Sequence, residues 1–530
     1  MFDSSVELIS LNLSNFNTSK VVEIREIFNE CNALSSLDIK SFNTSKVTNM
    51  SGIFNGCNSL TSLDLSSFNT SNVNNMYSMF GNCFKLTSLD LTKFNTSKVT
   101  NMSLMFSSCE LVNAMNISNF NTSKVVEMYG MFAACRALTT LDLSNFDTSK
   151  VTNMNSMFYS CSSISSLNLQ NFNTSQVTDM GSMFIYCYNL KSLNISNFDT
   201  TKVTSMFTMF SNCRSLTSLN LSNFNTSNVV NMTGMSMLCQ ELKSIEISKF
   251  DTSKVLDMVY TFGYCNSLES LNISNFNTSS VRDMKYMFTN CSSLKILNLS
   301  NFDTSKVTDM KEMFSYSSSL EYLNLSNFDT SQVTDMSIMF GGCTSIKSLN
   351  LSNFNTLNVK DMSQIFTFCQ NLLSLDISNF VISNDTDFRF MFSYIDSLEL
   401  LNISNLDTSQ VTKMNLMFEG CTIKSLDLSN LNTSQVTDMS SMFLDSKIIS
   451  LDLSHLNTSK VKNMRKMFSN SIFETLNLSN FDTSLVTDMS EMFSGCTIKS
   501  LDLSSFNTSQ VTDISRMFAN VNNLTSLNFI

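Results

Sequence analysis

The sequence predicts an α/β repeat solenoid, with one parallel β-sheet on the concave side and short helices or 3-10 turns on the convex side. Three observations predict this fold. Phenylalanine recurs at a spacing of 26 residues from Phe16 to Phe380. An L-x-x-L-x-L pattern of apolar residues precedes each of these positions, and an apolar pattern with helical spacing follows it. A fixed period of this length is the signature of stacked coils that share one continuous core.

The repeat extends along the whole chain of 530 residues. The units have 26 residues up to about residue 420 and 25 residues after it, where the phenylalanine position holds Leu431, Leu456, Phe481 and Phe506. Because stacked repeats form one quasi-one-dimensional domain, residues 1–530 are predicted to be a single continuous solenoid of about 20 coils. No polar capping repeat is visible at either end, so we expect either bare solenoid ends or a piece of a longer array.

The strand prediction rests on Leu60, Leu63 and Leu65 of a representative unit. Apolar and polar residues alternate at the end of this stretch, which is typical of a strand with one buried face, and the units repeat the pattern in the same phase. Strands stacked in register would form one parallel sheet. The turn-rich stretch that follows has one apolar residue, Phe68, which is predicted to point into the core.

The helix prediction rests on the spacing i, i+3, i+4, i+7 that begins at Met76 and continues through Met79, Phe80 and Cys83. The preceding residue, Asn75, is a suitable N-cap, because its side-chain oxygen can accept a hydrogen bond from the first turn. A helix of about two turns would not be stable alone in water. We therefore expect its apolar face to hold it against the stack.

All 15 cysteines occupy one position of the repeat, the third after the Met-Phe pair. Neighbouring coils would place these side chains about 4.8 Å apart and parallel, whereas a disulfide needs facing Cβ atoms about 3.8 Å apart. The cysteines are therefore predicted to be free, buried thiols, and their spacing provides no metal site. Where cysteine is missing, the position holds Ser317, Ile395, Ser446, Ser471 or Val521.

Two units depart from the pattern. Ser236 stands at the second phenylalanine position, where we expect a tolerated packing defect. In the unit that begins at Phe380, Asp385 replaces the usual valine. Asn384, Asp385 and Asp387 carry oxygen ligands for a cation, but their spacing matches no calcium loop, so we expect a locally looser coil and no metal.

Composition and motifs exclude several functions. The net charge is −11 with no basic stripe, so no nucleic-acid partner is expected. No apolar run approaches the roughly 18 residues of a membrane-spanning helix, so no membrane insertion is expected. His455 is the only histidine and is interpreted as a surface substitution, and the chain has neither a glycine-rich phosphate loop nor a hydrolase motif. We therefore predict no catalytic residues, no cofactor and no enzyme activity.

The position between the two final strand leucines is predicted to face solvent and to form a column with a spacing of about 4.8 Å. It holds Asp, Glu or Asn and is flanked by Ser and Thr. Two interpretations remain open: an asparagine-type ladder that stabilises the stack, or a polar, weakly acidic strip that binds a protein, a glycan or a cation. This candidate binding strip comprises Asp38, Asp64, Asp90, Asn116, Asp142, Asn168, Asn194, Asn220, Glu246, Asn272, Asn298, Asn324, Asn350, Asp376, Asn402, Asp427, Asp452, Asn477 and Asp502.

The unit from Leu138 to Cys161 reads LTTLDLSNFDTSKVTNMNSMFYSC. It resembles the 25–26-residue repeat of BspA-like leucine-rich-repeat surface proteins, which is also known from mycoplasma lipoproteins as a domain of unknown function. The resemblance covers the whole chain. It implies a leucine-rich-repeat solenoid at a microbial cell surface or outside the cell, with adhesion as a function claimed for some members and no catalytic residues. The chain departs from the family in showing no secretion signal and no anchor.

Two functions follow from these expectations. The first is a non-catalytic leucine-rich-repeat surface protein that mediates adhesion, or recognition of a protein or glycan, through its concave polar face. The alternative is an intracellular or secreted structural scaffold that assembles end-to-end through its uncapped solenoid ends. A signal peptide and an anchor in flanking sequence would favour the first, and concentration-dependent assembly would favour the second.

Overall fold

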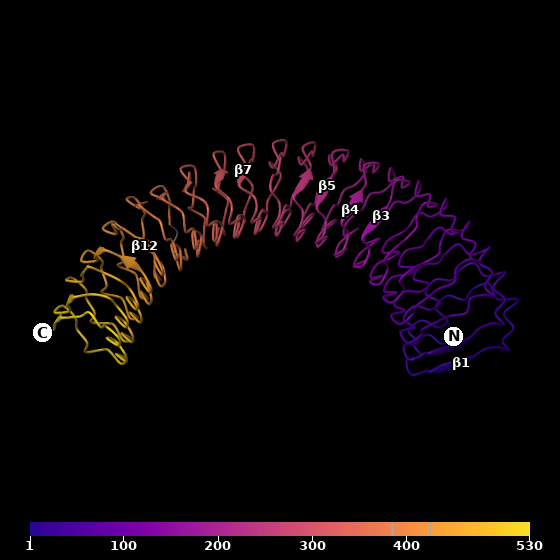
Figure 1. The fold of residues 1–530 in the computed structure, drawn as a ribbon, viewed down its shortest axis with the longest axis horizontal. Coiled ribbons are helices and arrows are strands. Elements are labelled where there is room, and N and C mark those ends of the chain that lie inside the picture. The colour runs from indigo at the N-terminus through magenta and orange to yellow at the C-terminus, as the bar shows by residue number, and fades with distance from the viewer. Residues whose placement is uncertain (383–385, 425, 530) are drawn as a thin grey trace. The chain divides into compact units, whose positions relative to one another are not determined.

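The computed structural model describes residues 1–382, 386–424 and 426–529. The chain forms two compact units, Met1–Phe276 and Asn277–Ile530. Each unit is a stack of coils, as Figure 1 shows, which confirms the predicted repeat solenoid. Asn384 and Asp385, two members of the cation site considered above, lie outside the described residues.

The strands of the first unit are short and parallel. β1 pairs with β2, β3 with β4 and β5 with β6, and partners within each pair are offset by one repeat. Their bounds are β1 Ser10–Asn12, β2 Ser36–Asp38, β3 Ser166–Asn168, β4 Ser192–Asn194, β5 Ser218–Asn220 and β6 Ser244–Glu246.

The second unit has the same kind of strands. β7 pairs with β8, β9 and β11 flank β10, and β12–β13, β14–β15 and β16–β17 form further pairs. The prediction of parallel strands is confirmed, but the described residues form ladders of two or three strands instead of one continuous sheet. The bounds are β7 Ile296–Asn298, β8 Tyr322–Asn324, β9 Ser348–Leu349, β10 Ser374–Asp376, β11 Leu400–Asn402, β12 Thr422–Ile423, β13 Lys447–Ile448, β14 Ser450–Asp452, β15 Thr475–Asn477, β16 Ser500–Asp502 and β17 Ser526–Asn528.

The predicted helices are wrong, since no helix occurs among the described residues. In the segment from Met76 to Cys83, alternate backbone N–H groups donate to carbonyl oxygens of the next coil, while the others close tight turns within their own coil. We call this segment, which recurs along both units, the turn ladder. Its bonds to the next coil join Met76 to Asn101, Ser78 to Ser103, Phe80 to Met105 and Asn82 to Ser107, with N···O distances of 3.0, 2.8, 2.9 and 2.7 Å.

The apolar residues of the turn ladder have the same spacing as those on one face of a helix. Its backbone enters the left-handed region at two positions per coil, such as Ser78 (φ 49°) and Asn82 (φ 56°). These reversals keep Met76, Met79 and Phe80 fully buried. A spacing of i, i+3, i+4, i+7 therefore did not distinguish a helix from this chain of turns.

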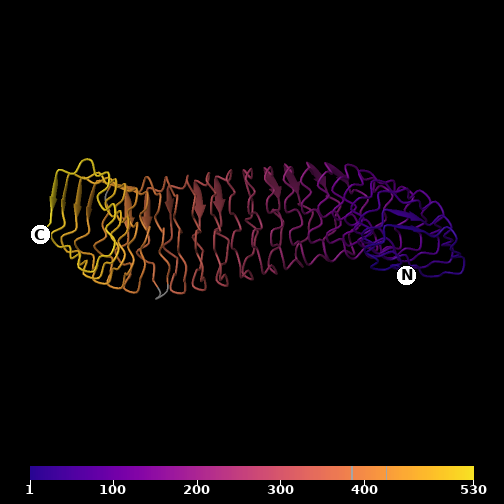
Figure 2. The same ribbon diagram turned by 90° about the horizontal axis from the view of Figure 1, so that it is seen from below.

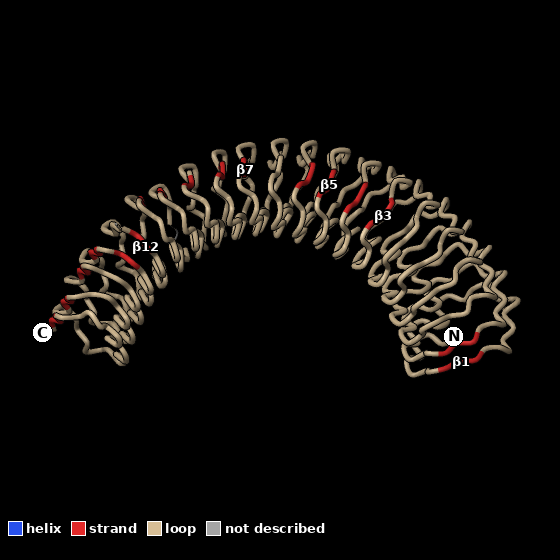
Figure 3. Tube along the Cα trace, in the orientation of Figure 1, coloured by secondary structure: helices blue, strands red, loops and turns tan. Residues whose placement is uncertain are grey.

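The strand side and the turn-ladder side hold neighbouring coils to different extents. The turn ladder is bonded from coil to coil at four positions per repeat, whereas the strand side is bonded over two or three residues. Within each unit, Figure 3 shows turns along the inner edge of the curve and the strands set back from that edge. The expectation of a sheet on the concave side is therefore wrong. The turn ladder lies there instead, and it bonds neighbouring coils at more positions than the strands do.

The coils of each unit follow one another at regular spacing (Figure 2). Two rows of phenylalanine rings fill their core. In the row next to the turn ladder, the rings of Phe80 and Phe106 stack with centroids 5.8 Å apart and an interplanar angle of 3°. In the other row, the centroids of Phe42 and Phe68 are 6.5 Å apart. Ser236 interrupts the first row, but its hydroxyl is buried and donates to the carbonyl oxygen of Thr261 over 2.7 Å.

The cysteines are free and buried, as predicted. The thiol of Cys83 donates to the carbonyl oxygen of Phe54 in the preceding coil, with an Sγ···O distance of 3.2 Å. Burial raises the pKa of this thiol to about 12. At neutral pH the thiol therefore remains protonated and available as a hydrogen-bond donor.

A row of buried threonines, which we did not predict, also links neighbouring coils. The hydroxyl of Thr70 donates to the carbonyl oxygen of Asn95 over 3.0 Å and accepts from the N–H of the same residue over 2.7 Å. The Thr70 side chain is 1% exposed. One hydroxyl thus satisfies two backbone groups of the next coil, which explains why a polar residue occupies an inward position.

Candidate functional site

The candidate binding strip lies on the strand side, at the last residue of each strand or its equivalent, and most of its members are exposed. Every member uses a side-chain oxygen to accept a hydrogen bond from the backbone N–H two residues later. The nineteen distances lie between 2.9 and 3.3 Å. The strip therefore has a structural role: it ends each strand with a side-chain turn.

Two further side-chain turns of this kind occur in each regular coil. In the representative unit, Asp64, Asn69 and Asn75 all accept from the N–H two residues later, at 3.0, 3.0 and 2.9 Å. Asn75 is the residue predicted to cap a helix, and it caps the first turn of the turn ladder instead. Asp or Asn suits all three positions because each position needs a short side chain with an acceptor oxygen.

These hydrogen bonds lower the pKa of several strip carboxylates. At Asp64 the hydroxyl and the backbone N–H of Ser66 are the main causes, and at Asp452 the two groups of Ser454 act in the same way. These two carboxylates therefore remain ionised at neutral pH. A general asparagine ladder is not formed. Among the described residues, hydrogen bonds of this kind run from Asn477 to Asp452, at 2.9 Å, and to Asp502 from Asn528, the equivalent residue of the next coil, at 3.2 Å.

The strand face, by which we mean the outward side chains of the strands and the residues just before them, also carries apolar residues that the sequence analysis missed. The first strand position holds Ser in most strands, but it holds Ile296, Tyr322 and Leu400 in β7, β8 and β11. These three side chains are 63%, 54% and 63% exposed. Ile296 and Tyr322 are direct partners in the pairing of β7 with β8, so they form one apolar pair beside Asn298 and Asn324.

Charged residues of alternating sign border this pair. The residue before the strand is Lys295, Glu321 and Lys347 in three successive coils, and all three are exposed. Further along the second unit, Lys424 lies 3.7 Å from Glu399, measured between Nζ and Oε1. The strand face of the second unit thus combines apolar side chains with a charged border.

Shallow hollows lie along the strand face. One of about 250 Å³ is lined by Leu373, Glu399 and Lys424 among others. Another of about 300 Å³ lies over Asp38 and Asp64 in the first unit. These hollows are places where a partner's side chains could contact the strip.

Metal-ligating side chains do not cluster in the part of the chain that the structure describes. Within that part, no group of three or more His, Cys, Asp or Glu side chains is arranged to hold a metal ion. His455 is exposed, as predicted for a surface substitution. The described residues also contain no helical segment with the length and apolar character needed to cross a bilayer.

A model of the family described as "Mycoplasma protein of unknown function, DUF285" matches the chain over residues 1–88, 82–167, 160–245, 219–296, 290–400, 386–475 and 452–528. The chain belongs to this family. The DUF285 assignment confirms the resemblance to the mycoplasma repeat that the sequence indicated. The curated proteins contain no match to this DUF285 protein.

Several solved structures are similar to the DUF285 protein at low identity. A leucine-rich repeat protein from Bacteroides ovatus is 19% identical, with 62% of this chain and 76% of that chain covered and a TM-score of 0.32. A leucine-rich cell surface protein from Faecalibacterium prausnitzii is 17% identical, with 48% and 77% covered and a TM-score of 0.25. The functional domain of InlJ from Listeria monocytogenes, which includes a cysteine ladder, is 14% identical, with 81% and 71% covered and a TM-score of 0.24.

Proposed function

We propose that this DUF285 protein is a non-catalytic surface protein that mediates adhesion by recognising a protein partner through its strand face. The observation that carries the proposal is the exposed pair of Ile296 and Tyr322 on strands whose outward positions are mostly Ser, Thr, Asn and Asp. The strip itself is committed to side-chain turns, so it would form the polar surround of the site and the apolar pair would be its anchor.

The chemistry of the strand face favours a protein over a glycan at this position. Contiguous exposed apolar side chains rimmed by polar residues are typical of protein–protein contacts. Tyrosine is among the residues that contribute most binding energy when a contact excludes water. The alternating Lys295, Glu321 and Lys347 would fix the register of a partner with complementary charges.

The proposal is tested by replacing both anchors with the residue that most other strands carry. The variant Ile296→Ser with Tyr322→Ser keeps the strand pattern, so the fold should be retained. Beads coated with the natural chain or with the variant are added to immobilised, enzymatically deglycosylated fibronectin, laminin and collagen. We expect the variant to lose at least about tenfold in bound beads. Equal binding by the variant and the natural chain, or no binding by either, would contradict the proposal.

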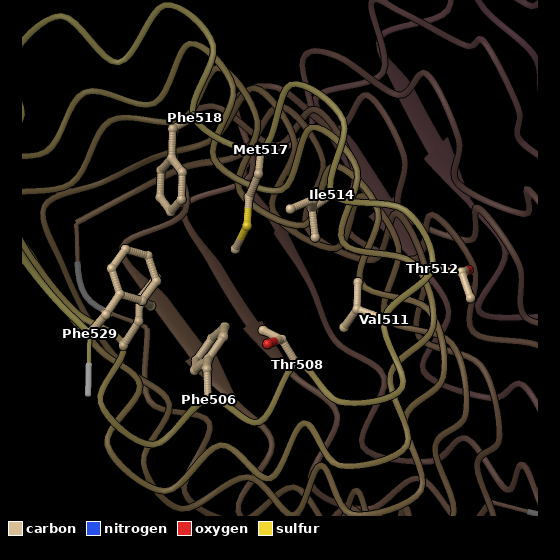
Figure 4. A pocket seen from close by; sticks show the side chains of 9 residues that line it. Phe506, Thr508, Val511, Thr512, Ile514, Met517, Phe518 and Phe529 are labelled. Atoms are coloured by element: carbon tan, nitrogen blue, oxygen red, sulfur yellow. The ribbon is translucent and has the colours of Figure 1, made fainter.

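End-to-end assembly is a second candidate, favoured by the coil that contains Phe506 and Phe518. This coil exposes apolar core residues around a hollow of about 460 Å³, and Figure 4 shows Phe506, Met517, Phe518 and Phe529 facing it. The turn-ladder bonds run from the N–H groups of one coil to the carbonyl groups of the next. A second copy that placed its first coil on this hollow would extend the same bonding pattern.

Light scattering after size-exclusion chromatography tests this candidate. We expect the mass of the 530-residue chain to rise with concentration and to fall back to that of one copy in the variant Phe518→Ser. A mass of one copy over a wide range of concentrations would exclude end-to-end assembly.

A further inference from the structure

Tyrosine has an unusual distribution in this chain. Tyrosine is absent from both core rows, which phenylalanine fills, and Tyr322 lies on strand β8. Tyr188 directly follows the cysteine of its coil. The other nine of the 11 tyrosines lie in turn ladders: Tyr77, Tyr129, Tyr159, Tyr186, Tyr260, Tyr264, Tyr286, Tyr316 and Tyr394.

The backbone gives no reason for aromatic residues at several of these positions. Tyr186 has a φ of 62° and Tyr264 a φ of 61°, in the left-handed region that glycine and asparagine adopt more readily. Other coils place Asn82 and Asn212 at the same position of the repeat as Tyr186, with φ values of 56° and 60°. The coil therefore forms without the ring, and the ring requires another explanation.

In the first unit, three tyrosines and one arginine from successive coils form a cluster, here called the tyrosine cluster. The ring centroids of Tyr159 and Tyr186 are 5.6 Å apart at an interplanar angle of 88°. Those of Tyr186 and Tyr188 are 5.9 Å apart at 60°. The guanidinium carbon of Arg214 lies 4.6 Å from the centroid of the Tyr188 ring. Contacts within the cluster hold the rings in fixed orientations at the surface.

The tyrosine cluster has polar groups ready for a ligand. Within the described part of the chain, the hydroxyl groups of Tyr159, Tyr186 and Tyr188 have no hydrogen-bond partner. Tyr159 is 36% exposed.

The turn ladders that carry the cluster hold no charged side chain. In the three turn ladders that begin at Met154, Met180 and Met206, no position up to the cysteine is occupied by Asp, Glu, Lys or Arg. Arg214 is the nearest cation, and its Nε and Nη2 atoms are directed at the Asn212 side-chain oxygen, at 3.4 and 3.3 Å. The strand face differs from these turn ladders because it carries alternating Lys and Glu side chains.

We infer that the tyrosine cluster binds a neutral glycan. The C–H faces of a pyranose ring stack on aromatic rings, and its hydroxyl groups exchange hydrogen bonds with phenol groups, serine and asparagine. A nucleic acid or a highly charged peptide would need several opposite charges, and Arg214 is the one charged member of the cluster. The inference extends the proposed function, because the cluster lies on the turn ladder and the protein-binding anchors lie on the strands. The two sites can therefore fail independently.

The test uses neutral oligosaccharides as probes. Cellohexaose, maltohexaose and mannohexaose are titrated into the full chain, and binding is read by ligand-observed saturation-transfer NMR and by tyrosine emission, which is readable because the chain has no tryptophan. A heparin-derived hexasaccharide is the charged comparison. We expect at least one neutral probe to bind with a dissociation constant on the order of 0.1–1 mM.

Matched variants separate the cluster from the rest of the fold. Tyr159→Ser and Tyr186→Asn introduce residues that other coils carry at the same positions, so the turn ladder should form as before. We expect this pair of substitutions to weaken binding of the neutral probe at least about tenfold, while Tyr322→Ser leaves it unchanged. Retained binding in the cluster variant, an equal loss in Tyr322→Ser, preference for the heparin hexasaccharide, or no binding by the natural chain up to about 5 mM probe would each overturn the inference.

Discussion

Thr330 provides a direct test of the buried threonine row. Its side chain is fully buried, and its hydroxyl donates to the carbonyl oxygen of Asn355 over 2.8 Å and accepts from the N–H of Asn355 over 2.8 Å. Thr330→Val keeps the shape of the side chain and removes both hydrogen bonds. The two backbone groups of Asn355 would then lose their partner in the preceding coil.

The expected loss follows from these two groups. A buried polar group left without a partner costs about 1–3 kcal/mol. The side chain of Asn355 is exposed, so water can reach part of its backbone and the cost per group lies at the low end. We therefore expect Thr330→Val to lower the free energy of unfolding by about 1–3 kcal/mol in total.

The measurement combines urea unfolding with amide hydrogen exchange. Coils interact mainly with their neighbours, so the loss should be largest in the coils on either side of the substitution and should appear there as faster exchange. Thr334→Val, in the same coil, is the matched control. Thr334 is exposed, and its hydroxyl makes one bond, to the carbonyl oxygen of Thr308 over 3.1 Å. We expect the control to change stability by less than about 0.5 kcal/mol. If the two variants unfold at the same urea concentration, the threonine row does not contribute as argued.

Two further predictions concern carboxylates. Burial, with Asp283 and Asp335 adding repulsion, raises the pKa of Asp309, whereas hydrogen bonds from Ser305 lower the pKa of Asp303. Asp309→Asn should therefore raise the urea midpoint at pH 7, and this gain should fade as the pH falls through the folded-state pKa of Asp309. Asp303→Asn should lower the urea midpoint at pH 7, and this loss should fade as the pH falls through the folded-state pKa of Asp303. Shifts of the same sign for the two variants at pH 7 would refute the argument. In the first unit, changing Asp38, Asp64 and Asp90 together to Asn should lower the thermal midpoint less than changing them to Ala. Asn keeps the acceptor for each turn but loses the charge that hydrogen bonds from Ser66 and Thr92 stabilise at Asp64 and Asp90. Equal midpoints for the Asn and Ala variants would show that the side-chain turns do not stabilise the coil.

The sequence by itself determined the period, the number of coils and the direction of most side chains. The repeated Leu63, Phe68, Met76 and Cys83 positions face inward because an apolar residue recurs there in nearly every unit, and burial of apolar surface decides such positions without reference to detailed geometry. Asn75 was also recognised as a capping residue, since a short acceptor side chain suits the start of a turn as well as that of a helix.

The tertiary structure alone decided where the backbone hydrogen bonds go. The N–H of Phe80 bonds to a carbonyl group 25 residues away, and no local pattern distinguishes that partner from one four residues away. For the same reason, one unit of sequence could not show that Thr70 makes two hydrogen bonds to the next coil or that the strands lie away from the inner edge. Nor could it show the exposure of Ile296 and Tyr186. Each depends on what the neighbouring coil presents, and stacking brings together residues that the sequence keeps a full repeat apart.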